Sequence, residues 1–182
     1  MVNKDLADVL GNFVNRILKF TESRFGGVVP EGGEPGELEA KLAANLSAQI
    51  AELSEQLEAI EIRKAAQALR AIWVAGNEYL AEAAPWTAIK TDPARAAVIT
   101  RTALNLVALY ARLSAPFIPS AAKTIAGAVG QGEVAQTWPQ ADEAWWSVLP
   151  AGRTVQTPEV LFRKVEDTQL AEWAERFGGA EA

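Results

Sequence analysis

Three polar side chains of different chemistry follow one another near the start of the chain at intervals of four residues: Asp8, Asn12 and Arg16. Residues four apart are neighbours on a helix, so an acid, an amide and a guanidinium would line one edge of it. This edge has two interpretations. It is either a solvated face with weak i, i+4 pairing, or a surface on which Asn12 and Arg16 donate hydrogen bonds to base edges.

Two further side chains are candidates for the same surface. Trp86 follows Pro85 at a break in the helical pattern, where a rigid ring can stack on an unpaired base. Position alone leaves this open, because most tryptophans belong to a core. Asn77 lies two turns before the break, at the edge of an apolar face. Its favoured role is to satisfy backbone groups at the turn.

The residue types that are missing limit the chemistry. The sequence has no His and no Cys, which excludes zinc sites built on imidazole or thiolate, catalytic triads and disulfides. Neither phosphate-cradling pattern, GxxxxGK[ST] or GxGxxG, is present, and the glycine-rich residues 26–36 are typical of a surface loop. The carboxylates are scattered singly. We therefore expect no catalytic residue, no metal and no cofactor in this chain.

Charge and hydropathy limit the kinds of partner that the chain can bind. The net charge of −6 argues against strong non-specific binding to nucleic acid, and so against DNA. Recognition of RNA by a few placed groups stays open, because unpaired bases are read by stacking and edge hydrogen bonds. No apolar run approaches the length of a membrane span, and the start lacks the layout of a signal peptide. We expect a cytoplasmic monomer with no membrane partner.

Hydrophobic periodicity predicts an all-α fold. Apolar residues recur at helical spacing in five segments, and the fourth of them is apolar nearly all round, which is typical of a central helix. Gly76, in the middle of the third, predicts the close approach of another helix or a ligand. The pattern indicates an antiparallel bundle of about five helices. The segments are residues 6–25, 35–58, 59–83, 93–114 and 120–129.

The remainder of the chain is less regular. We expect residues 1–130 to form the bundle and residues 131–182 to form an irregular, tryptophan-rich cap and a tail that packs back on it. Residues 160–165 could be extended, and residues 167–177 could close as a short helix with Asp167 as its N-cap. The apolar side chains of the tail are expected to be buried partly on the bundle and partly elsewhere: Leu161, Phe162, Trp173 and Phe177.

Taken together, five segments resemble one known family. They are VNKDLADVLGNFVNR at 2–16, FGGVVP at 25–30, NEYLAEAAPW at 77–86, LSAPFIPSAA at 113–122 and PEVLFRKVED at 158–167. Their order and spacing resemble the C-terminal anticodon-binding domain of bacterial methionyl-tRNA synthetases. The resemblance covers nearly the whole chain.

The resemblance implies a function. The family is a class I aminoacyl-tRNA synthetase that joins methionine to its tRNA with ATP, and its helical domain reads the CAU anticodon. An Asn and an Arg four residues apart, and the Trp of the APW segment, fall on Asn12, Arg16 and Trp86. Some relatives use an Asn one turn earlier, where this chain has Asp8, a residue that accepts hydrogen bonds but repels phosphates. The implied partner is the anticodon loop of tRNA(Met).

The same resemblance implies that a catalytic half is absent from these 182 residues. Without His there is no HIGH motif, KMSKS does not occur, and without Cys there is no zinc knuckle. ATP and, in many members, zinc would belong to that half, with which the tail is expected to share an interface. We expect an excised recognition module that is inactive alone as a methionine–tRNA ligase.

Two alternatives remain. The same fold occurs in sister class I synthetases, such as the cysteinyl, leucyl, isoleucyl and valyl enzymes, although the APW segment together with Asn12 and Arg16 disfavours them. A helical partner-binding module without an RNA role is the other, and the negative charge favours it slightly.

Overall fold

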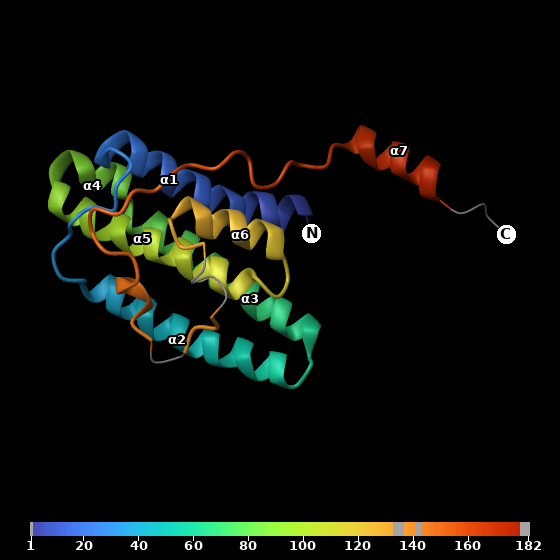
Figure 1. Cartoon of the computed structure of the whole chain (residues 1–182), viewed down its shortest axis with the longest axis horizontal. Helices are drawn as coiled ribbons and strands as arrows, with labels where there is room; N and C mark the ends of the chain where they lie inside the picture. Colours follow the sequence, from blue (N-terminus) through green and yellow to red (C-terminus); the bar gives the residue numbers. More distant parts are fainter. Residues whose placement is uncertain (1, 133–136, 141–142, 179–182) are drawn as a thin grey trace.

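The computed structural model describes residues 2–132, 137–140 and 143–178, and long helices packed around one core make up most of them (Figure 1). The predicted all-α class is confirmed. The elements are a π-type stretch at Val2–Gly11, α1 at Asn12–Phe25, α2 at Glu37–Glu58, α3 at Ile62–Ala83, α4 at Pro85–Thr91, α5 at Pro93–Ser114, α6 at Pro119–Ala128, a 3-10 turn at Trp145–Ser147 and α7 at Asp167–Phe177.

The opening helix is longer than predicted. Its first part, Val2–Gly11, has wide turns of the π type, in which hydrogen bonds join residues five apart. Gly11 keeps helical angles (φ −62°, ψ −41°), so this part continues directly into α1. The helix ends at Gly26, as predicted. Gly26 has a φ of 62°, a left-handed conformation that costs glycine little because it has no Cβ.

Helices α2 and α3 form a hairpin whose facing stripes are buried. The predicted stripe of α2 is confirmed, since four of its leucines and isoleucines are at most 6% exposed. On α3 the helical spacing of the apolar residues predicts that Ile62 shares the buried face, and this is wrong: Ile62 is 54% exposed. It is the first residue of α3 and follows Ile60, which is 80% exposed and has a φ of 60°. The tip of the hairpin therefore lies outside the core. The buried residues of α2 are Leu42, Leu46, Ile50 and Leu53.

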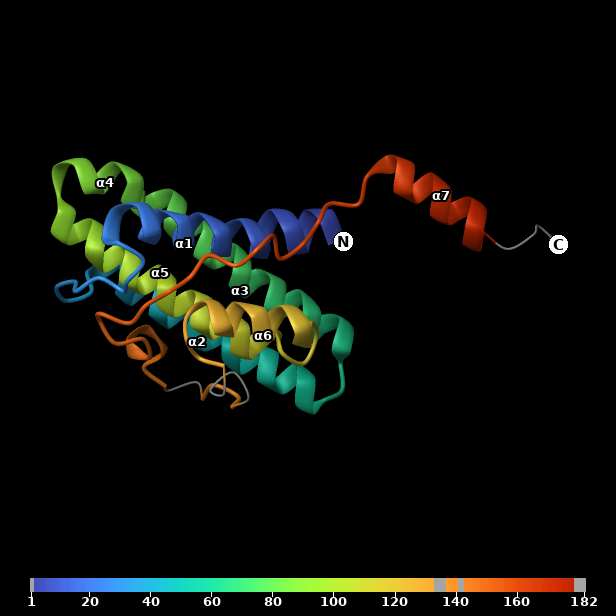
Figure 2. The ribbon, with the colours of Figure 1, turned by 45° about the horizontal axis from the view of Figure 1, so that its top comes forward.

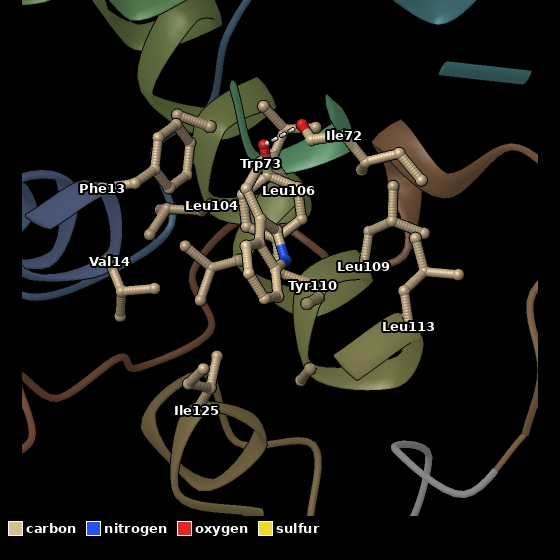
Figure 3. Packing of buried hydrophobic residues seen from close by; sticks show 14 of the residues in the cluster. Phe13, Val14, Ile72, Trp73, Leu104, Leu106, Leu109, Tyr110, Leu113 and Ile125 are labelled. Atoms are coloured by element: carbon tan, nitrogen blue, oxygen red, sulfur yellow. Dashed lines mark hydrogen bonds between the residues drawn. The ribbon is translucent and has the colours of Figure 1, made fainter. Parts of the chain in front are cut away.

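Helix α5 occupies the predicted central position, with its predicted bounds. Nearly every residue from Ala96 to Ser114 is buried, and α1, α3, α4 and α6 all pack on it. By length and composition alone α5 could cross a membrane, but 94% of its most apolar window is buried in the protein, as expected for a core helix. Figure 3 shows the side chains of α5, α1 and α3 meeting around Tyr110 and Phe13.

Polar residues on α5 hold the loops. The guanidinium of Arg101 donates to the carbonyls of Gly32 (3.2 Å) and Gly33 (2.8 Å) in the glycine-rich loop. The Asn105 side chain accepts a hydrogen bond from the backbone N–H of Leu149 at 2.8 Å. Arg101 and Asn105, which are polar residues on an otherwise apolar helix, thus anchor segments that have no periodic pattern of their own.

A second anchor on α5 joins the tryptophan-rich segment to the bundle. Arg112, 5% exposed, forms a two-pronged ion pair with Glu143 and donates to the carbonyl of Thr137 at 2.9 Å. Trp145 is buried against the core, and the indole N–H of Trp138 donates to the Ser54 hydroxyl of α2 at 2.9 Å. The described part of this segment therefore lies against the bundle; residues 133–136 and 141–142 of the predicted cap lie outside the described residues.

The tail divides into two parts. Residues 158–166, which we call the strap, lack regular structure and run back along the opening helix (Figure 1). Here Leu161 and Phe162 pack against the core, as expected. Helix α7 forms over its predicted residues, although its N-cap is Glu166 rather than Asp167. It projects away from the bundle in both Figure 1 and Figure 2, and its apolar residues are exposed. Within the described residues of the tail only the strap thus packs on the bundle; Trp173 and Phe177 do not, and their expected burial elsewhere stays a prediction.

Candidate functional site

The turn between α3 and α4 fixes the position of Trp86. Ala84 adopts a left-handed conformation (φ 42°, ψ 64°) that ends α3, and α4 begins at the next residue, Pro85. Proline suits a first helical position because its missing N–H would have no partner there. The break at Pro85 was predicted from the sequence, but α4 was not, since an apolar repeat does not stand out in a helix of only seven residues. Trp86 thus lies in the first turn of a short helix.

Trp86 and Arg16 are in direct contact. The guanidinium carbon of Arg16, on α1, lies 4.4 Å from the centroid of the Trp86 ring. Trp86 is partly buried against the core, whereas Arg16 is exposed. The distance is within the range of a cation–π interaction, which holds the planar guanidinium against the indole. Two residues that are 70 positions apart in the sequence therefore form one stacked surface.

The two asparagines of the prediction lie in different settings. Asn12 is exposed on α1, one turn before Arg16. The amide of Asn77 is used internally: its Nδ2 donates to the carbonyls of Trp73 (2.9 Å) and Val9 (3.2 Å). This is the backbone-satisfying role that sequence analysis favoured, except that the carbonyls belong to two helices and not to the turn. Asn77 thus ties α3 to the opening helix, while the Asn12 amide faces solvent.

Asp8 faces the strap. Its carboxylate lies 2.6 Å from Nζ of Lys164, and both side chains are about half exposed. Asp8 and Asn12 line a groove of about 530 Å³ between the opening helix and the strap, whereas Arg16 and Trp86 are not among its lining residues. Lys164 could not be recognised from the sequence, because only the folded chain brings position 164 beside position 8.

A buried network away from these residues also shifts pKa values. Burial by itself raises the pKa of Glu39, but hydrogen bonds from Arg95, Tyr79 and the Gly36 N–H outweigh it and leave the pKa lowered. Both carboxylate oxygens are occupied, one by Tyr79 and Arg95 and the other by Arg95 and Gly36, at 2.5–2.8 Å. A carboxylate with all its acceptors in use fits a structural link between α2, α3 and α5 rather than acid–base catalysis.

Comparison with known proteins decides the family. A family model described as the anticodon binding domain of methionyl tRNA ligase matches residues 29–182. The chain belongs to this family. The methionine–tRNA ligase of Caulobacter vibrioides is 67% identical over 181 residues, and that of Jannaschia sp. is 58% identical over 178. These matches cover 99% and 98% of the chain, so they include the opening helix with Asn12 and Arg16, which precedes the family model's range.

Solved structures of methionyl-tRNA synthetase have the same fold. The apo enzyme of Mycobacterium tuberculosis superposes with a TM-score of 0.78 at 25% identity, over 91% of this chain and 33% of that one. Its complex with methionyl-adenylate gives a TM-score of 0.79 at 26% identity, over 90% and 32%. The family match also excludes the alternative that the chain belongs to a sister class I synthetase.

The chain spans about a third of the length of the curated methionine–tRNA ligases that it matches. The zinc knuckle implied for the remaining two thirds does not fit the residues present here. Zinc in such a knuckle needs thiolate or imidazole ligands, and the sequence has neither Cys nor His.

Proposed function

We propose that this chain binds tRNA(Met) by recognising its CAU anticodon, as the recognition module of a methionine–tRNA ligase. The observation that carries the proposal is the stack of Arg16 on Trp86, with Asn12 exposed one turn away. Unpaired bases are recognised by stacking on aromatic rings and guanidinium planes and by hydrogen bonds to their edges. Arg16, Trp86 and Asn12 supply these functions on one surface. The parent would act in the cytoplasm, as translation enzymes of this kind generally do.

Each of the three residues has a separate role. Trp86 gives a rigid platform on which one anticodon base stacks, either directly or with the Arg16 guanidinium between them. Arg16 adds planar, paired donors that match the acceptors of a base edge, a geometry that lysine lacks. Asn12 contributes an amide that can both donate and accept. Asp8 and Asn77 are the weaker candidates, because the first is paired with Lys164 and the second bonds backbone carbonyls.

The net negative charge of the chain shapes the expected affinity for RNA. A net charge of −6 gives little general attraction to phosphates, so binding should depend on base contacts and only weakly on salt. The ATP-dependent ligation of methionine would require the two thirds of the relatives' length that this chain does not match. We propose that this part contacts the exposed apolar side of α7, formed by Leu170, Trp173 and Phe177.

The anticodon proposal is tested by titrating a dye-labelled stem-loop with the 182-residue chain and measuring fluorescence anisotropy. A CAU loop should bind more tightly than loops in which one anticodon base is changed. Trp86→Ala should weaken CAU binding roughly 5- to 100-fold, the range expected for one base–aromatic stack. Trp146→Ala is the matched control, because Trp146 is a partly exposed tryptophan of a different segment. Equal binding to CAU and altered loops would overturn the proposal.

The role of Arg16 is tested by a conservative change. Arg16→Lys keeps the charge but removes the planar fork, so CAU binding should weaken while the preference between loops declines. Arg24→Lys serves as the control, since Arg24 is also exposed on α1, two turns further on. If Arg16→Lys bound like the unmodified chain, Arg16 would act only through its charge.

A further inference from the structure

Asp8 and Lys164 form an ion pair at a place where the Asp8 carboxylate alone would repel an anionic ligand. Asp8 precedes Asn12 by four residues on the opening helix, about one turn, and both line the same groove. A bare carboxylate so near to Asn12 would oppose the phosphates that flank an anticodon base. Within the described residues, Lys164 of the strap is the cation that meets this carboxylate, at 2.6 Å.

The strap is fixed on both sides of this contact. The Asn3 side chain exchanges two hydrogen bonds with the backbone of Val165: its Nδ2 donates to the carbonyl at 2.9 Å, and its Oδ1 accepts from the N–H at 2.8 Å. The Phe162 ring packs on Gly11 so closely that an added Cβ would lie 3.2 Å from it. Residues 162–165 therefore hold their place along the opening helix without the help of the ion pair.

The pair itself contributes little to folding. The Asp8 and Lys164 side chains are 52% and 57% exposed, and solvated ion pairs of this kind add little to stability. Because other contacts position the strap, removal of the lysine charge should leave the fold intact. The charge should act mainly on what approaches the surface.

We propose that Lys164 is a positioning residue for RNA binding, which neutralises the Asp8 carboxylate beside Asn12. The proposal rests on the anticodon-binding function proposed above and adds the tail to it. Neutralising the lysine exposes the carboxylate and weakens binding, and removing the carboxylate as well restores it. Lys164 acts on the field at the site and does not itself hold a phosphate.

The test compares four chains in the stem-loop titration at 0.1 M salt, where the Debye length is about 10 Å. Lys164→Met should weaken binding about three-fold, as expected for one unmasked charge at this distance in a solvated setting. Asp8→Ala should leave binding equal or tighter, and the double variant should return to within about two-fold of the unmodified chain. Alanine is used at position 8 because asparagine would add a donor of its own.

Two results would overturn the proposal. If the double variant stays as weak as Lys164→Met, the lysine contacts the RNA directly. If Asp8→Ala weakens binding as much as Lys164→Met, the pair acts by holding the structure. Hydrogen exchange at the Val165 amide, which bonds to Asn3, shows whether the strap stays in place in each variant. Unchanged exchange in Lys164→Met is expected; faster exchange contradicts the proposal.

A second ion pair, between α3 and the opening helix, provides the control. Arg70 of α3 and Asp5 of the opening helix lie 2.6 Å apart, and Asp5 is three residues further from Asn12 than Asp8 is. Arg70→Met should weaken binding less than Lys164→Met does, because the unmasked Asp5 carboxylate is further from Asn12 and salt screens it more. The two proposals can be overturned separately. Equal binding to CAU and altered loops overturns anticodon recognition. The effect of Lys164→Met can still be measured in that case, on the binding that all the loops share. If no stem-loop binds, both are overturned.

Discussion

The hydroxyl of Tyr110 occupies the space that a side chain at Gly76 would need. A Cβ built on Gly76 would lie 1.9 Å from Tyr110 Oη, and this hydroxyl donates a 3.1 Å hydrogen bond to the carbonyl of Ile72 on the same helix as Gly76. The Tyr110 side chain is fully buried and its ring meets Phe13 at 5.2 Å. The glycine that is unfavourable for α3 by itself thus allows α3 and α5 to pack closely, as the sequence predicted.

Substitution of Gly76 should lower the free energy of unfolding. Gly76→Ala should destabilise the fold by about 2–3 kcal/mol, because overpacking a closed core outweighs the gain of about 1 kcal/mol in helix propensity. Urea unfolding followed by circular dichroism measures the change. Gly127→Ala is the control: Gly127 is exposed in α6 and has open space around it, so this variant should be no less stable than the original. Equal effects of the two substitutions would contradict the packing argument.

The Glu39 network makes stability depend on pH. The pKa of Glu39 is lowered in the folded chain, so its contribution is present above the ordinary value of 4.5 and is lost as pH falls through the folded pKa. Glu39→Gln should cost roughly 2–3 kcal/mol at pH 7 and progressively less below pH 4.5. Urea unfolding over this pH range measures the difference. A pH-independent difference would contradict the prediction, and Glu37→Gln, exposed in the same first turn, should change stability by no more than about 0.5 kcal/mol.

The tryptophan-rich segment should depend on one arginine. Arg112→Lys replaces the two-pronged contact to Glu143, whose pKa is lowered chiefly by the hydrogen bond from Arg112, and also loses the bond to Thr137. We expect a loss of roughly 2–4 kcal/mol, with faster hydrogen exchange in residues 143–149 before α1 to α5 are affected. Arg101→Lys, whose donors reach loop carbonyls only, should cost less. If the two lysine variants exchanged alike, the link to Glu143 would not be what holds the segment.

Helix α7 should be dispensable for the bundle. Leu170, Trp173 and Phe177 are 52%, 46% and 69% exposed, and no residue of α7 is buried. Deletion of residues 167–182 should therefore change the free energy of unfolding by no more than about 0.5 kcal/mol. Hydrogen exchange should be fast throughout α7 and slow at Val165, whose N–H bonds to Asn3. A uniformly protected tail, or a large loss of stability on deletion, would show that α7 packs on the bundle.

The fold was predictable where local signals and periodicity agree. Helix α5 has its predicted bounds because Asp92 caps it, with its carboxylate accepting from the Arg95 N–H, and Pro93 occupies the first position. Helix α4 was missed because its seven residues make only about two turns, too short a stretch for an apolar repeat to stand out. The exposure of Trp173 was missed because an amphipathic pattern shows that a helix has an apolar side but not what covers it.

The candidate site was predictable in part for a similar reason. Spacing placed Asn12 and Arg16 on one helix, and the Pro85 break marked Trp86, but the 4.4 Å contact between Arg16 and Trp86 depends on how α1 and α4 pack. The partners of Asp8 and Asn77 also come from distant segments. The roles of Asn12, Arg16 and Trp86 in binding RNA stay predictions until the stem-loop titrations are made.

The left-handed turn at Ala84 has an entropic consequence. Because α4 starts directly after this residue, no flexible linker separates the Trp86 ring from α3. Fixing one residue of a mobile loop costs about 1–2 kcal/mol, and folding has already met this cost for the whole turn. A base that stacks on Trp86 would therefore meet a preorganised ring, and the entropic cost of that stack would fall mainly on the RNA loop.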